Sequence, residues 1–235
     1  MEENNSLPQH IGFIMDGNGR WAKKRAMPRN FGHKQGAAVF KKTINWCREL
    51  GVKAATFYAF STENWKRPED EVNGIMNLLR QYIKDILAMA RENVRFIFVG
   101  DLSPFDEDIR VELLDIMEDS KENTEFIAGV ALNYGGRAEI TNAARIIAKK
   151  CAAGEISCDE ITEELLEENL YTSEFPPLDL VIRPSGEQRL SNFLIWQAAY
   201  AECVFMDVLW PDFKKKDLEY AINEFAGRSR RFGGI

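Results

Sequence analysis

The sequence predicts an α/β fold, a single domain built on a six-stranded, mostly parallel sheet with helices on both faces. Short apolar runs alternate with amphipathic stretches along the chain, and strands that alternate with helices form parallel sheets covered on both sides. The 235 residues are enough for one sizeable core. Because the sequence contains no repeat, low-complexity segment or linker, we expect residues 1–235 to form one domain.

The strands are predicted from short runs of apolar and β-branched residues that are bounded by turn residues. The first run leads directly into a turn rich in glycine and asparagine, and the third run ends at Gly100. In chain order, the strands are expected at residues 11–15, 52–60, 94–99, 126–132, 178–182 and 203–207.

Amphipathic segments between these runs predict the helices. Ile75, Leu79 and Ile83 share one face at helical spacing, and Gly51 marks the end of the helix before the second strand. In chain order, helices are expected at residues 36–50, 73–91, 104–120, 137–153, 159–170, 192–200 and 216–226.

The composition narrows the class of protein. A net charge of −7 argues against a general nucleic-acid binder. The N-terminal segment MEENNSLPQ is acidic and polar, unlike a signal peptide. The most apolar long stretch, residues 190–210, is interrupted by polar residues and falls short of a membrane span. The four cysteines lack metal-ligand spacing and fit reduced thiols, so we expect a cytoplasmic protein that does not bind nucleic acid.

The turn DGNGR, residues 16–20, follows the first strand and is the strongest candidate for a site. Its two glycines let backbone N–H groups approach a ligand, and the helix that follows favours negative charge at its start. Because Asp16 would repel a phosphate there, the pattern suggests a Mg²⁺ ion between the carboxylate and the phosphate. The alternative is a plain turn with a solvated Asp16.

The same turn also fits the loose dinucleotide-binding pattern G-x-G-x-x-A over residues 17–22. That pattern requires an acidic residue about 20 residues further on, at the end of the second strand. Residues 39–43 are apolar and basic instead, and the sequence contains no G-x-x-x-x-G-K-[ST] motif. We therefore discount a dinucleotide site.

Four unusual polar clusters follow the first, second, fourth and fifth predicted strands, at residues 16–20, 61–67, 133–137 and 183–189. The carboxyl ends of parallel strands meet at one end of a sheet, where ligands bind. Arginine matches phosphate oxygens bidentately, so several arginines there suit more than one phosphate, although a surface ion pair is the alternative for any one of them. Asn192, with Ser191 before it, is expected to open the next helix as a cap. The cations expected at this end are Arg20, Arg29, Arg67, Arg183 and Arg189, with His33 as a further donor.

Apolar residues are expected beside these cations. Trp21, Tyr58, Phe60 and Trp65 lie near the predicted site, and the helix face from residues 75 to 89 is wider than one core contact needs. Two phosphate-binding clusters beside an apolar cleft suggest a lipid diphosphate as ligand. The alternative for the helix is a face fully covered by the core.

Long motifs of the chain resemble the cis-prenyltransferases, most of all the bacterial undecaprenyl diphosphate synthases: HIGFIMDGNGRWA, PRNFGHKQG, YAFSTENWKRP, LNYGGRAEI and RPSGEQRLSNFLIWQAAYAE, with DVLWPDF. The resemblance runs from about Pro8 to Gly234. It implies repeated condensation of isopentenyl diphosphate with an allylic diphosphate such as farnesyl diphosphate, giving a polyprenyl diphosphate lipid carrier for cell-wall synthesis. It also implies a homodimer, with transient contact to the inner membrane surface for product release. The alternative is a non-catalytic partner subunit of a prenyltransferase complex.

The resemblance also implies roles for individual residues. Asp16 matches the catalytic, Mg²⁺-linked aspartate, Glu202 a second metal-associated carboxylate, and Asn64 the residue proposed to assist proton removal. An amide is a poor base, so the diphosphate leaving group is an equal candidate for the proton acceptor. The substrate-binding residues implied are Gly17, Asn18, Gly19, Arg20, Trp21, Arg29, His33, Ser61, Thr62, Glu63, Trp65, Arg67, Arg183, Arg189, Leu190 and Ser191.

The chain departs from the family pattern at two positions. Pro184 replaces the usual threonine and removes a hydroxyl and a backbone donor from the isopentenyl diphosphate site. Ala26 replaces a frequent glycine, so the backbone angle of that turn is expected to differ. In the tail, residues 227–235 contain an R-x-G pattern, and by resemblance we expect residues 231–234 to complete the isopentenyl diphosphate site of a partner subunit. The composition of this polar tail favours the alternative, a solvated chain end.

Overall fold

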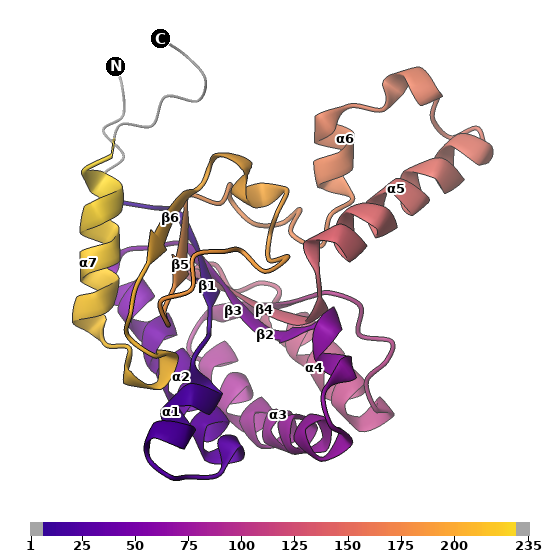
Figure 1. Cartoon of the computed structure of the whole chain (residues 1–235). Coiled ribbons are helices and arrows are strands. Elements are labelled where there is room, and N and C mark those ends of the chain that lie inside the picture. The colour runs from indigo at the N-terminus through magenta and orange to yellow at the C-terminus, as the bar shows by residue number, and fades with distance from the viewer. Residues whose placement is uncertain (1–6, 229–235) are drawn as a thin grey trace.

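A computed structural model describes residues 7–228 of the chain and places six strands in one sheet. The strand order is β3-β4-β2-β1-β5-β6, and every neighbouring pair is parallel. The predicted fold class is confirmed, with a fully parallel sheet (Figure 1). The strands are β1 (His10–Ile14), β2 (Ala54–Ser61), β3 (Val94–Val99), β4 (Phe126–Tyr134), β5 (Leu180–Arg183) and β6 (Glu202–Phe205).

The described residues form seven α-helices and four short 3-10 helices. The α-helices are α1 (Asn18–Lys24), α2 (Arg29–Leu50), α3 (Glu69–Ala90), α4 (Glu107–Ser120), α5 (Gly136–Ala152), α6 (Glu163–Glu168) and α7 (Lys215–Ala226). The 3-10 helices are η1 (Thr62–Lys66), η2 (Cys158–Glu160), η3 (Gln197–Tyr200) and η4 (Trp210–Asp212). None of the helices in residues 7–228 is long and apolar enough to cross a membrane.

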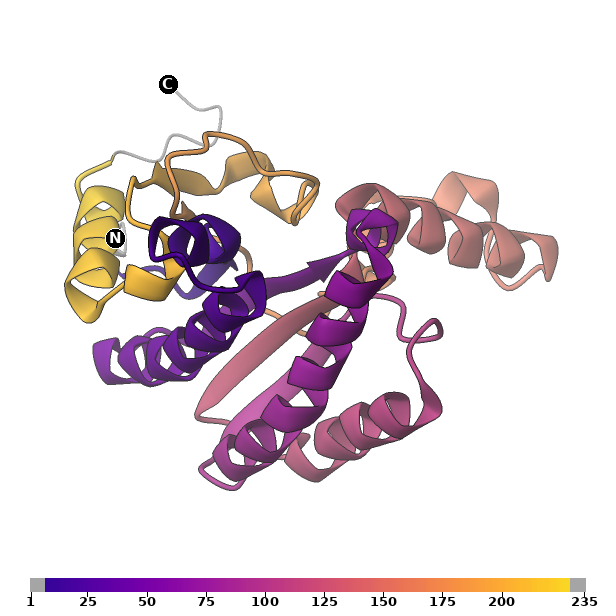
Figure 2. The same ribbon diagram turned by 60° about the horizontal axis from the view of Figure 1, so that its bottom comes forward.

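The larger core lies between one face of the sheet and helices α2, α3, α4 and α7. Figure 2 shows α2, α3 and α4 side by side over this face. Phe13 of β1 stacks on Phe57 of β2 with ring centroids 4.9 Å apart, and the rings of Phe57 and Phe40 of α2 pack at an interplanar angle of 80°. Residues of β1 point alternately to the two faces, so Ile14 joins the smaller core with Phe193.

The opposite face of the sheet is covered by chain segments rather than by a long helix. Residues 170–178 and 190–201, including η3, supply this cover, while α5 and α6 project from it as an arm (Figure 1). The predicted helix at residues 192–200 is therefore wrong. Ser191, Asn192 and Leu194 have left-handed backbone angles, with φ of 51°, 65° and 44°, which a right-handed helix excludes.

The start of α2 also differs from the prediction, because the helix begins at Arg29 and not at Gly36. Helix α1 packs closely against this first part of α2. A Cβ atom on Gly32 would lie 2.1 Å from the carbonyl oxygen of Asn18, so glycine permits the contact. A glycine-containing turn of helix gives no apolar periodicity, and this explains why the sequence did not predict it.

Three other predicted helices need correction. Helix α3 begins at Glu69, directly after Pro68, rather than at residue 73, because proline is well suited to a helix start. The predicted helix at residues 159–170 is divided into η2 and α6. The helix predicted from residue 104 begins at Glu107.

Candidate active site

Three of the four polar clusters meet at the carboxyl end of the sheet, which is the end where each strand finishes. A cavity of about 610 Å³, here called the β2–β5 cavity, is lined by the turns after β1, β2 and β5. The cluster at residues 133–137 lies behind it, where Asn133 accepts a hydrogen bond of 2.8 Å from Trp65 Nε1. The carboxyl end of the sheet therefore holds the charged site that the parallel strands predict.

Asp16 lies among three polar partners, and all of them contact the same carboxylate oxygen. Arg183 Nη2 and Ser185 Oγ each donate to Asp16 Oδ2 at 2.9 Å, and Arg20 Nη2 lies 3.1 Å from it. Burial alone would raise the pKa of Asp16, but these donors and charges outweigh it and hold the pKa below its usual range. Asp16 Oδ1 receives no hydrogen bond from residues 7–228, so an ionised oxygen remains available to a ligand.

Arg183 links Asp16 to the segment that follows β5. Its side chain is only 4% exposed, and Nη1 donates to Ser191 Oγ at 2.8 Å and to the carbonyl oxygen of Arg189. Its buried Nε has no partner among the described residues. Arg183 therefore holds this part of the site in place, whereas the Arg189 side chain is 59% exposed and pairs with the carboxylate of Glu187.

A second cavity of about 580 Å³, the β1–α2 cavity, lies beside the first and is lined by residues 15–20, Lys23, Ala26, Met27, Arg29, His33 and Arg67. Burial, followed by the charges of Arg67 and Arg29, lowers the pKa of His33 to about 4. His33 is thus neutral at neutral pH, and its buried Nε2 has no partner in residues 7–228. A neutral imidazole between two arginines can donate to an anion when its Nε2 carries the proton.

Glycines bring the backbone and the cations of this cavity together. Gly17 directly precedes α1 and has a φ of 106°, and a Cβ there would lie 2.9 Å from Leu209. A Cβ on Gly19 would lie 2.9 Å from Arg29 Nε. The DGNGR turn therefore needs glycine at position 17, and glycine at position 19 lets the Arg29 side chain approach the backbone closely.

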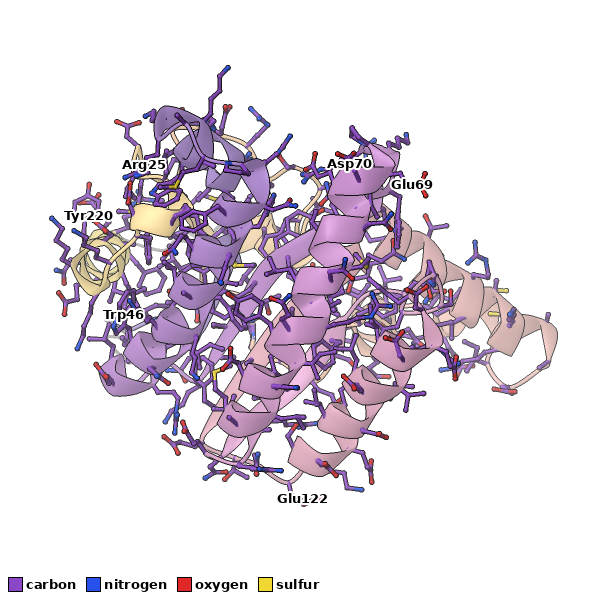
Figure 3. The ribbon with its side chains drawn as sticks, turned by 90° about the horizontal axis from the view of Figure 1, so that it is seen from below. Arg25, Trp46, Glu69, Asp70, Glu122 and Tyr220 are labelled. Carbon is purple, nitrogen blue, oxygen red and sulfur yellow. The ribbon has the colours of Figure 1, made fainter. Side chains whose placement is uncertain are left out.

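An apolar slot opens from the two cavities. It lies between α2 and α3, has a volume of about 120 Å³, and shares Met15, Asn18 and His33 with both cavities. In Figure 3, Asp70 lies in the first turn of α3, at the end near the site, and Glu122, which follows α4, lies at the opposite end of the view. Its remaining walls are mainly apolar and include Phe40, Phe60, Ile75, Met76, Leu79, Ile86 and Leu132.

Comparisons with known proteins agree with this geometry. Residues 14–233 match the family described as "Putative undecaprenyl diphosphate synthase". The isoprenyl transferase of Clostridium perfringens is 51% identical over 230 residues, which cover 97% of this chain and 91% of that protein. The farnesyl-diphosphate-specific ditrans,polycis-undecaprenyl-diphosphate synthase of Micrococcus luteus is 46% identical, covering 97% and 92%. The chain belongs to the undecaprenyl diphosphate synthase family.

Solved structures of this family have the same fold. Lavandulyl diphosphate synthase from Lavandula x intermedia, solved with dimethylallyl diphosphate, superposes with a TM-score of 0.94 at 35% identity, covering 97% of this chain and 99% of that one. A probable undecaprenyl diphosphate synthase from Campylobacter jejuni gives a TM-score of 0.79 at 34% identity, covering 96% and 98%. The predicted resemblance to the cis-prenyltransferases is confirmed, and the chain is a prenyltransferase of a family that generally uses a divalent metal and prenyl diphosphate substrates.

Most of the residues predicted from the family pattern line the two cavities. They are Asp16, Gly17, Asn18, Gly19, Arg20, Arg29, His33, Ser61, Glu63, Asn64, Arg67, Arg183, Arg189 and Ser191. Thr62 and Leu190 belong to the same turns without lining either cavity. Trp21 and Trp65 have supporting positions, since Trp21 Nε1 donates to Asp212 at 2.8 Å and the edge of Trp65 packs against Phe60.

Glu202 lies away from the other predicted residues. It begins β6 in register with Leu180, which is itself paired with Ile11. Asp16 is five residues beyond Ile11, which places the two carboxylates on the order of 15 Å apart along the strands. Glu202 pairs with Arg228 at 2.7 Å, and no group of three metal-ligating side chains occurs in the described residues. One chain therefore does not bring Asp16 and Glu202 to one ion, and the metal role of Glu202 stays a prediction.

Two acidic residues of the site were missed by the sequence reasoning. Glu71 of α3 pairs with Arg29 at 3.2 Å and with Arg67 at 2.8 Å, while Glu187 pairs with Arg20 and Arg189. Each carboxylate thus holds two of the predicted phosphate-binding arginines. Glu187 stands between two arginines in RPSGEQR, and this was a signal available in the sequence.

The two departures from the family pattern have different outcomes. Ser185, next to Pro184, supplies the hydroxyl that bonds Asp16, and its N–H donates to the Val208 carbonyl at 2.7 Å. Ala26 has a φ of 53°, so an alanine adopts the left-handed angle that glycine favours. The predicted tail segment, residues 231–234, lies outside the described residues.

Proposed function

We propose that the chain is a Mg²⁺-dependent cis-prenyltransferase. It condenses isopentenyl diphosphate repeatedly onto an allylic diphosphate, with farnesyl diphosphate as the first candidate, and makes a polyprenyl diphosphate carrier for cell-wall synthesis. The observation that carries the proposal is the convergence of three charged turns and Asp16 Oδ1 at the mouth of an apolar slot. Family membership supports the reaction class.

The allylic diphosphate is assigned to the β1–α2 cavity. As the allylic C–O bond breaks, negative charge grows on the departing diphosphate, and fixed cations stabilise that charge. Arg20 and Arg29 supply such cations, and His33 supplies a neutral donor. Mg²⁺ prefers one or two carboxylates plus phosphate oxygens, and Asp16 Oδ1 fits such an ion, which when bound would neutralise part of the charge on the leaving group.

Isopentenyl diphosphate is assigned to the β2–β5 cavity. Arg189 and Ser191 face that cavity, and Arg183 holds the segment that carries them. Anchoring this diphosphate brings the double bond of isopentenyl diphosphate near the allylic carbon, where the new C–C bond forms as the C–O bond breaks. One proton is then lost, giving the elongated diphosphate, a free diphosphate ion and H⁺.

The position of Asn64 bears on where that proton goes. Asn64 Oδ1 accepts the N–H of Ser61 at 3.1 Å, which fixes the orientation of the side chain and leaves its NH₂ group to face substrate. An amide held in this way is a hydrogen-bond donor. We therefore assign Asn64 to substrate positioning and the departing diphosphate to proton acceptance.

The apolar slot is the proposed site of the growing chain. Its volume of about 120 Å³ is below the roughly 300–1,000 Å³ of pockets that bury a drug-sized ligand. Elongation thus requires α2 and α3 to separate. Their facing side chains, such as Phe40 and Leu79, are flexible apolar groups that can rearrange around a lipid tail.

Assembly and location are also part of the proposal. We propose one catalytic domain over residues 1–235 that works as a cytoplasmic homodimer and meets the inner membrane face when product leaves. The position of Glu202 favours a dimer, because its predicted role at the metal requires a residue from a second copy. An apolar product favours contact with a membrane surface.

Incubation with labelled isopentenyl diphosphate, farnesyl diphosphate and Mg²⁺ tests the proposed function. A ladder of polyprenyl products is expected, and omission of Mg²⁺ or addition of a chelator should remove it. A non-catalytic partner subunit would give no product alone under any of these conditions. We do not favour that alternative, because Asp16, Arg183 and Arg189 all remain at the cavities.

A further inference from the structure

Asn192 follows the isopentenyl diphosphate segment and has no role in the proposed reaction so far. Its φ of 65° places it in the left-handed region together with Ser191. Asparagine is one of the few side chains that tolerates this angle, since it can bond to nearby backbone. The expected helix is absent here, so Asn192 cannot serve as the cap of its own helix.

Asn192 instead caps α5, which begins 56 residues earlier in the chain. Its backbone oxygen accepts the Gly136 N–H at 2.7 Å, and its Oδ1 accepts the Arg137 N–H at 2.9 Å. The first N–H groups of a helix have no partner within the helix, and Gly135 has no side chain to offer. Asn192 therefore satisfies two donors of α5 from a distant segment.

The remaining polar atom of Asn192 reaches the turn after β2. Its Nδ2 donates to Glu63 Oε1 at 3.1 Å. A Cβ atom on Gly135 would lie 2.7 Å from Asn192 Nδ2 and 2.9 Å from Thr62 Oγ1. The glycine of NYGGR thus leaves room for the two turns to meet, which gives a physical reason for that motif.

We infer that Asn192 is a positioning residue that fixes the separation of the two walls of the β2–β5 cavity. One wall is η1 with Ser61, Glu63 and Asn64, and the other carries Arg189 and Ser191. Asn192 bonds the first wall through Glu63 and holds the second through its own backbone, with α5 as the rigid support. Ser191, the neighbour of Asn192, accepts a hydrogen bond from Arg183, and Arg183 donates to Asp16. Displacement of Asn192 should therefore also change the position of Asp16.

This inference rests on the proposed condensation, and a double-mutant cycle tests it. Asn192→Asp keeps an acceptor for α5 but turns a carboxylate toward Glu63, and Asn192→Asp with Glu63→Gln restores the bond with donor and acceptor exchanged. We expect Asn192→Ala and Asn192→Asp each to lower kcat/KM for isopentenyl diphosphate about tenfold or more. The double variant should return to within about threefold of Glu63→Gln alone.

The comparison of KM with kcat separates positioning from folding. The KM for isopentenyl diphosphate should rise in Asn192→Asp while its melting temperature stays that of wild type, because its carboxylate still caps α5. Asn223→Ala, on an exposed face of α7, is the matched control and should behave as wild type. Activity of Asn192→Ala within about twofold of wild type, or no rescue in the double variant, would overturn the inference.

Two measurements do not require turnover. Amide hydrogen exchange at Arg137 should be faster in Asn192→Ala and unchanged in Asn192→Asp and Asn223→Ala. Calorimetry with inorganic diphosphate should show weaker binding in Asn192→Ala. If wild type makes no polyprenyl product, the proposed function fails, and these two measurements decide the role of Asn192 by themselves: unchanged exchange and unchanged diphosphate affinity would refute it.

Discussion

Buried polar side chains at the two ends of the sheet differ in whether their polar atoms have hydrogen-bond partners. At the amino end, both ring nitrogens of His10 are bonded, to Thr56 Oγ1 at 2.8 Å and to the Pro176 carbonyl at 3.0 Å. At the carboxyl end, Asn18 Oδ1, His33 Nε2 and Arg183 Nε are buried without partners in residues 7–228, and two other such atoms, Asn45 Oδ1 and Gln197 Oε1, lie away from this end. An unpartnered buried polar atom destabilises a fold and requires an explanation. Three of these five atoms belong to residues that line the two cavities, which indicates that a ligand supplies the missing partners there.

The strongest test of this contrast is Asp16→Asn. The substitution keeps the shape of the side chain but removes the charge that Arg183 and Arg20 surround. We expect kcat to fall on the order of 100-fold or more, as for loss of a charge-stabilising group. Circular dichroism should show an unchanged fold, and steady-state assays measure the loss. Activity within about tenfold of wild type would refute the assignment of Asp16.

The structure gives Arg183 and Arg189 different roles, although the sequence predicted the same role for both. Arg183 is buried against Asp16, whereas Arg189 is exposed. Arg189→Ala removes an exposed side chain and should raise KM for isopentenyl diphosphate about tenfold or more, the effect of one charge-assisted contact. Arg183→Ala should also lower kcat and the melting temperature, because Asp16 then loses a buried partner. Kinetics for both substrates and thermal unfolding decide this. Equal effects of the two variants on kcat, KM and melting temperature would show that Arg183 does not hold Asp16 in place.

The two buried histidines, His10 and His33, should each make the stability of the protein depend on pH. Burial, the largest cause at each, lowers the pKa of His10 and of His33 from 6.5 to about 4. Unfolded chains bind the proton first as pH falls below 6.5, so stability is full above pH 6.5 and is lost progressively toward pH 4. At about 1.4 kcal/mol per pKa unit, the lowered pKa of His10 alone accounts for on the order of 3 kcal/mol of unfolding free energy that is lost at acid pH.

A ligand should act at one of these histidines only. Inorganic diphosphate bound near His33 favours the protonated imidazole and should restore part of the stability lost at acid pH. We expect this rescue in wild type and in His10→Gln, and a smaller one in His33→Gln, measured by thermal unfolding at pH 5 and pH 7.5. Equal rescue in the two variants would show that His33 does not face the anion.

The apolar slot gives a smaller effect, on product length. Met76 lines the slot and is 7% exposed, whereas Ala88 of the same helix is exposed to solvent. Met76→Trp should therefore shorten the polyprenyl products by filling the slot, and Ala88→Leu is the matched control that should not. Chromatography of the products measures both. Unchanged lengths in Met76→Trp would return this helix face to an ordinary core role.

The contrast between the two ends also shows what the sequence could predict. The predicted parallel direction of the strands placed the charged turns at the carboxyl end, because apolar periodicity reports strands and the ends of parallel strands meet at one end of a sheet. It could not predict that Glu71 pairs with Arg29, since these partners lie far apart in the chain and meet only when it folds. Left-handed angles at Ser191 and Asn192 were equally hidden, because neither is glycine.

The smallest expected effect concerns the turn beside the β1–α2 cavity. Ala26 has a φ of 53° and is exposed, so its left-handed angle is strained and no buried contact of its methyl group opposes a change. Glycine adopts this angle without a steric cost but gains freedom in the unfolded chain. Because relief of the strain is the larger of the two terms, Ala26→Gly should stabilise the protein by up to about 1 kcal/mol. Chemical denaturation measures the change, and Ala153→Gly, which has an ordinary φ of −78°, should destabilise it instead. A loss of stability in Ala26→Gly would show that the left-handed angle of Ala26 is not a significant source of strain.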